Sequence, residues 1–82
     1  MSQVKIAVEV VREIVVVELH VGQLSSRMAQ LVHDDVLDRL DQLIDAGMAR
    51  WVKSRQDFYV VKPQCDVSAI ELAAEIKKQL RL

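Results

Sequence analysis

The sequence predicts a small α+β domain in which several helices and one β-hairpin share a core. Apolar residues recur at helical spacing in separate stretches, and a strand–turn–strand pattern precedes the last of these stretches. The chain has 82 residues, of which 51% are hydrophobic, so it can build one core of ordinary size. We therefore expect one domain over residues 1–82.

Residues 3–20 form the first expected element. Val4, Val8, Val11 and Val15 recur at spacings of three and four residues, which is typical of a helix. Residues 14–21 are rich in β-branched side chains and also alternate as a strand would, so both interpretations stay open there. We expect a helix that can give way to an extended stretch near His20 and that ends at Gly22.

Two further helices are expected on either side of a tight turn. Ser25 or Ser26 caps a helix that runs to about residue 32, and residues 33–35 form the turn. The next helix spans residues 35–46, and Gly47 ends it because glycine accepts the left-handed backbone conformation. The apolar stripe of this helix consists of Val36, Leu37, Leu40, Leu43 and Ile44.

The remaining third of the chain predicts a hairpin and a last helix. Strands over residues 48–53 and 58–62 flank a polar turn at residues 54–57, and Pro63 closes the hairpin. A helix over about residues 67–81 follows, because Ser68 and Glu71 have the spacing of a capping box. Its apolar stripe consists of Ala69, Leu72, Ala73, Ile76 and Leu80.

This order of elements resembles the winged helix-turn-helix family over about residues 4–62. The likeness rests on residues 24–29, on residues 36–48, and on the strand–turn–strand after them. It implies a three-helix core with a β-hairpin wing, to which the helix over residues 67–81 is an accessory. It also implies DNA binding led by the third helix, and a homodimer held by the last helix. The residues expected at the dimer contact are Leu72, Ile76 and Leu80.

The charges distribute unevenly along the chain. Residues 1–48 carry four basic and eight acidic side chains, whereas residues 49–82 carry seven basic and four acidic ones. Asp34, Asp38, Asp41 and Asp45 form an acidic stripe within about 60° on the third expected helix, where DNA would repel them. We therefore expect DNA contacts mainly from the basic hairpin. The full set of expected DNA contacts is Ser25, Ser26, Arg27, Arg39, Arg50, Lys53, Arg55 and Lys62.

Two functions follow from these patterns. The first is a small DNA-binding transcriptional regulator. The alternative is a protein–protein interaction module that uses the acidic stripe or an aliphatic helix face and binds no DNA. We expect no enzyme and no cofactor, because the sequence shows no set of nucleophile, base and orienting residue and no glycine-rich phosphate loop. We expect no metal site, because His33, Asp34 and Asp35 are consecutive and cannot converge on one ion. Cys65 is the only cysteine, which predicts a cytoplasmic protein. No apolar run is long enough to span a bilayer, so we expect no membrane association.

Overall fold

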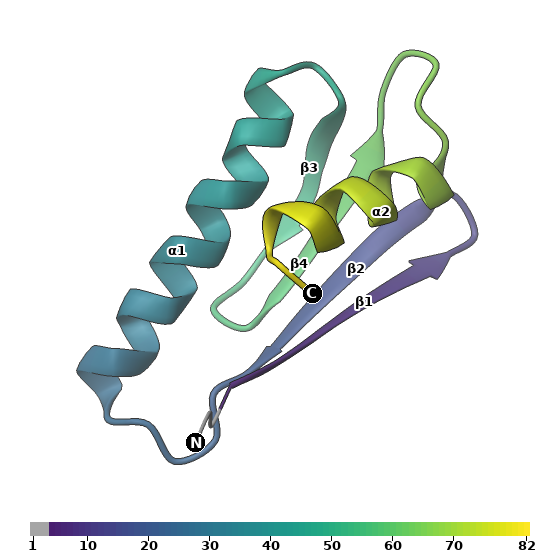
Figure 1. Ribbon diagram of the computed structural model, residues 1–82. Helices are drawn as coiled ribbons and strands as arrows, with labels where there is room; N and C mark the ends of the chain where they lie inside the picture. Colours follow the sequence, from purple (N-terminus) through teal and green to yellow (C-terminus); the bar gives the residue numbers. More distant parts are fainter. Residues whose placement is uncertain (1–3) are drawn as a thin grey trace.

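The computed structural model describes residues 4–82, which form a four-stranded antiparallel sheet with two helices on one of its faces (Figure 1). The elements in chain order are β1 (Lys5–Val11), β2 (Ile14–His20), α1 (Ser26–Asp45), β3 (Ala49–Ser54), β4 (Phe58–Pro63) and α2 (Ala69–Gln79). The strand order in the sheet is β1-β2-β4-β3, so β1 and β3 are the two edges. Neither helix of residues 4–82 is long and apolar enough to cross a membrane.

The helix predicted over residues 3–20 is wrong, because this segment is the hairpin of β1 and β2. Val15, Val17 and Leu19 alternate onto the side of the sheet that faces the helices, where none is more than 2% exposed. The strands meet at a turn of Arg12 and Glu13, and Arg12 takes a φ of 57°. The alternation in residues 14–21 was therefore the correct one of the two patterns. Residue 3, where the predicted helix began, lies outside the described residues.

The turn predicted at residues 33–35 is also wrong, because α1 passes through it without a break. The apolar stripe is continuous at helical spacing from Ala29 to Leu43. Gln30 Nε2 donates to Asp34 Oδ1 at 2.9 Å, and a similar i,i+4 contact follows one turn later, so the expected turn is bridged by side chains. With two helices in residues 4–82, the three-helix core of a winged helix-turn-helix domain is absent, and that fold prediction is wrong.

The ends of the helices follow the predicted signals. The N–H of Gly47 donates to the carbonyl of Ile44 at 3.0 Å, and the N–H of Met48 donates to that of Leu43 at 3.1 Å. This pair of bonds closes α1 while Gly47 adopts a φ of 78°, which confirms the predicted stop. The N–H of Glu71 donates to Ser68 Oγ at 3.1 Å, which confirms the predicted start of α2.

The hairpin predicted over residues 48–62 is confirmed to within a residue at each end, as β3 and β4. Its ladder is interrupted by a register shift between Trp51 and Lys53, a bulge that places Lys53 opposite Val60. The structure adds what the sequence did not show: β4 also pairs with β2 and so lies inside the sheet.

The core lies between the helices and the side of the sheet that they cover. α2 packs on β1, β2 and β4, whereas α1 packs on β3 and on α2 (Figure 1). Leu72 and Ile76, expected to contact a second copy, are 0% exposed inside this core and cannot reach one in the folded chain. Leu80 is half-buried against the same core. The apolar residues buried in this core are Val15, Val17, Leu19, Val36, Leu40, Leu43, Ala49, Tyr59, Val61, Leu72, Ala73 and Ile76.

Candidate interaction surface

The side of the sheet that faces away from the helices is the candidate site, and we call it the open face. Side chains alternate along each strand, so its members are the neighbours of the buried residues. They come from all four strands, and neither helix lies over them (Figure 1). The open face consists of Lys5, Ala7, Glu9, Val11, Ile14, Val16, Glu18, His20, Arg50, Val52, Lys53, Phe58, Val60 and Lys62.

The middle of the open face is apolar. Val16 and Val60 are cross-strand partners on the two inner strands, and Val60 is only 5% exposed although no helix covers it. Val52 and Val11, nearer the edges, are 53% and 41% exposed. A solvated face of an antiparallel sheet is usually polar, whereas half of this face is apolar. This composition distinguishes the open face from an ordinary solvated sheet face.

The charges of the open face are distributed unevenly across the sheet. Both of its carboxylates, Glu9 and Glu18, lie on β1 and β2, where Lys5 is the one basic side chain beside His20, whereas β3 and β4 carry only basic charges. Arg50 and Lys62 are direct cross-strand partners, and like charges in that arrangement destabilise a sheet. No carboxylate within residues 4–82 forms an ion pair with either of them. The basic half therefore offers unneutralised charge to an anionic group from outside.

The expected DNA contacts do not form one surface. Arg50, Lys53 and Lys62 do come together, on the open face. Ser25, Ser26 and Arg27 lie at the start of α1, in the helix layer on the opposite side of the sheet, and Arg55 lies in the turn between β3 and β4. The Oγ of Ser25 is already occupied as the N-cap of α1, where it accepts from the N–H of Met28 at 3.2 Å.

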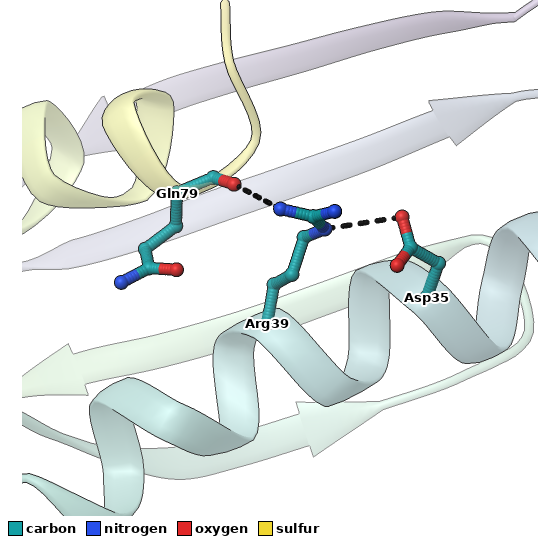
Figure 2. A network of polar contacts seen from close by, with 3 residues as sticks. All are labelled: Asp35, Arg39 and Gln79. Atoms are coloured by element: carbon teal, nitrogen blue, oxygen red, sulfur yellow. Dashed lines mark hydrogen bonds and ion pairs between the residues drawn. The ribbon is translucent and has the colours of Figure 1, made fainter.

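Arg39, the remaining expected DNA contact, joins the two helices instead. Its Nη1 donates to the backbone carbonyl of Gln79 at 2.8 Å, and its Nε donates to Asp35 Oδ2 at 3.1 Å (Figure 2). The carbonyl of Gln79 belongs to the last turn of α2, where carbonyls lack helical partners and the helix dipole favours a cation. Arg39 therefore stabilises the end of α2 and is not a free cation.

The acidic stripe predicted on α1 is exposed, but part of it is used within the chain. Asp41 Oδ1 accepts from Trp51 Nε1 at 3.2 Å, which connects α1 to the edge strand β3. Asp34 accepts from Gln30 as described above. Asp38 and Asp45 are exposed and have no such partner in the part of the chain described. This leaves two free carboxylates of the four expected to contact a partner.

Two polar side chains, His33 and Tyr59, are buried, which the sequence did not predict. His33 is 6% exposed and lines a hollow of about 630 Å³ between the start of α1 and the end of β2, together with Gln30 and Asp57. Its Nδ1 has no hydrogen-bond partner among residues 4–82, and no group of three or more metal-ligating side chains gathers in these residues. His33 occupies a position of the apolar stripe of α1, so we assign it to the core rather than to chemistry.

Tyr59 lies on the covered side of β4 and is 2% exposed. Its hydroxyl donates to the carbonyl of Gln56 at 3.1 Å, and its ring lies 6.3 Å from that of Trp51. Burial raises the pKa of Tyr59 above its ordinary value of 10.0, and the negative charges of Asp34 and Asp57 raise this pKa further. The hydroxyl is therefore held in its neutral form.

Comparisons of the chain with protein-family models, with curated proteins and with solved structures find no match. Function is therefore inferred from the chemistry of the surface. The open face is the side of the sheet that the helices leave bare, with an apolar centre and charged groups around it. The sequence signal for it was the alternation in residues 14–21 together with the basic hairpin.

Proposed function

We propose that this chain is a non-catalytic protein-interaction domain whose contact surface is the open face. The observation that carries the proposal is the bare apolar centre of the sheet around Val16 and Val60, flanked by charges of opposite sign. Apolar surface at the centre with charged groups around it is the usual anatomy of a protein–protein interface. The matching partner is a protein surface with an apolar centre, anions on one side and cations on the other.

The charges favour a protein over DNA as the partner. Affinity for DNA comes largely from cations that meet phosphates, and the carboxylates of Glu9 and Glu18 share the open face with the basic residues. Contact between an apolar centre and a phosphate backbone also contributes little to the free energy of binding, whereas burial of the centre against another apolar surface is favourable. The acidic stripe, on the opposite layer, adds no cation to the surface.

DNA binding by the basic half is the second candidate, because Arg50 and Lys62 lie side by side and no carboxylate of residues 4–82 forms an ion pair with them. A mobility-shift titration at about 50 mM salt tests it, since contacts to phosphates are strongest at low salt. If the second candidate is correct, R50A/K62A loses most of the binding. If the chain does not shift DNA even at this salt concentration, DNA binding is excluded.

Site-specific photo-crosslinking tests the proposed function. The photoreactive residue replaces Val52 on the open face or, as the matched control, Leu31 on α1, because these side chains are 53% and 56% exposed. We expect a protein adduct from position 52 that disappears when Val16→Lys is added, and no such adduct from position 31. If position 52 gives no adduct, or the same adducts as position 31, the open face is not the contact surface.

A further inference from the structure

We propose that the partner of the open face is a second copy of this chain, packed face to face about a two-fold axis. The axis runs parallel to the strands and between β2 and β4. This inference rests on the proposed function, and it names the partner. Three properties of the open face support it: the order of side chains across the sheet, the clash of like charges in the other two-fold arrangement, and the area of the face.

One row of residues across the open face is complementary to itself. Glu9 pairs with Val16, Val16 pairs with Val60, and Val60 pairs with Lys53, so the row reads acid, valine, valine, base. A two-fold axis parallel to the strands places this row over the same row of the second copy, in the opposite order. Glu9 of one copy then faces Lys53 of the other, and Val16 faces Val60. Because the contact is isologous, each of these pairs occurs twice.

The charges select this orientation over the other two-fold arrangement. If the axis ran across the strands, β1 would lie on β1 and β3 on β3, so that Glu9 would face Glu9 and Lys53 would face Lys53. Juxtaposed like charges disfavour an interface, whereas complementary potentials fix its register. Both two-fold arrangements keep the strands of the two sheets nearly aligned, as is common for sheets that pack face to face, so the charges decide between them.

The rows beside the central one are compatible with the same arrangement. The row that contains Val11 and Ile14 continues into the cross-strand pair Lys62 and Arg50. In the dimer, the apolar half of this row in one copy faces the basic half in the other. The alkyl stems of Lys and Arg cover apolar surface while their charged ends reach the rim. On the other side of the central row, Glu18 Oε2 lies 3.4 Å from His20 Nε2 of the same chain. In the dimer, Glu18 faces the ring of Phe58 of the other copy, because β2 of one copy lies over β4 of the other.

The area of the face predicts a weak dimer. Strands spaced about 4.8 Å apart, with about 3.3 Å per residue, give the open face a footprint of roughly 400 Å². Two such faces bury a total close to or below the lower end of the range for stable interfaces, about 1,200 Å². We therefore expect a dissociation constant in the micromolar range or weaker, which sets the concentrations at which the association is measured.

Sedimentation equilibrium of the purified full chain tests the proposal through a charge swap. E9K and K53E each place like charges in contact twice per dimer, so each is expected to raise the dissociation constant about tenfold or more. The double variant E9K/K53E restores both pairs with reversed polarity and is expected to regain dimerisation. Both residues are exposed and have no ion pair in residues 4–82, so the fold is retained, which circular dichroism checks.

Two matched controls carry the same changes of charge on the helix layer. D38K alters the net charge as E9K does, and K78E alters it as K53E does, but both sites are exposed on the helices. We expect wild-type dimerisation from each control. Loss of dimerisation in D38K equal to that in E9K would overturn the proposal, because net charge rather than the facing pair would then control association.

The outcomes also separate this inference from the proposed function. A chain that stays monomeric up to about 1 mM overturns the second copy as partner, because even a weak specific interface associates at that concentration. So does a dimer that is indifferent to both single charge reversals. If a monomeric chain still crosslinks from position 52 to a protein of another mass, the proposed function stands and only the partner is wrong. If it gives no adduct there, both proposals fall.

Discussion

The two sides of β2 and β4 differ in what their residues do. On the covered side, Val15 and Val17 are 0% exposed and pack against the helices. On the open side, their immediate neighbour Val16 is half-buried only by the side chains around it in the sheet. Residues of the same type, one position apart, therefore serve the stability of the fold on one side and, in the function we propose, contact with a partner on the other.

Threonine substitution in β2 gives the largest expected difference between the two sides. Val17→Thr places a hydroxyl in the core, where it has no partner group, and we expect it to lower the free energy of unfolding by about 2 kcal/mol. Val16→Thr keeps its hydroxyl in contact with water and is expected to change that free energy by less than about 0.5 kcal/mol. Urea denaturation at low protein concentration measures both without a contribution from association. Equal losses for the two variants would show that the open face is as dry as the covered one.

The helix layer itself depends on the connection between α1 and α2. Arg39→Ala removes the hydrogen bond to the carbonyl of Gln79 and the ion pair with Asp35. Because the site is part-buried, we expect a loss of about 1 to 1.5 kcal/mol in the free energy of unfolding. Arg27→Ala, at an exposed position of the same helix, is the matched control and should be close to neutral. If both variants have the stability of the wild type, Arg39 does not hold the helices together.

The smallest effect is confined to alkaline solution and concerns Tyr59, on the covered side of β4. The pKa of Tyr59 is raised in the folded chain, so its neutral form is favoured there and its stabilising contribution is complete below the unfolded value of 10.0. As the pH rises above about 10 toward the folded pKa, this contribution is lost and the free energy of unfolding falls. Tyr59→Phe should remove this part of the pH dependence in urea denaturation series between pH 8 and 11. An unchanged slope in this variant would assign the loss to other groups.

The elements that the sequence predicted correctly have local signals. Gly47 ends α1, Ser68 begins α2, and β3 and β4 are two strands around a polar turn. The first hairpin was missed because its turn is formed by Arg12 and Glu13, which carry none of the glycine or asparagine signals of a tight turn. Its valines also satisfied the spacing of a helix. Only packing against the helices decides between the two patterns.

The candidate surface was predictable only in part. The sequence shows the basic character of the hairpin in Arg50, Lys53 and Lys62, whereas only the register of the structure shows that they lie on one side of the sheet. The apolar centre depends on the pairing of Val16 with Val60, two residues far apart in the chain. Long-range pairing of this kind has no local signal. For the same reason the acidic stripe seemed more available than it is, since Trp51 binds Asp41 from another element.

The bulge in β3 has a consequence for how a valine-rich sheet avoids aggregation. β3 is an edge of the sheet, and the register shift between Trp51 and Lys53 disturbs the regular row of backbone groups that an added strand would require. The other edge, β1, carries the charged side chains of Lys5 and Glu9, which discourage strand addition in the same way. Growth into fibres is thereby opposed at both edges of the sheet. The dimer that we propose uses the open face instead, where a two-fold contact is complete with two chains.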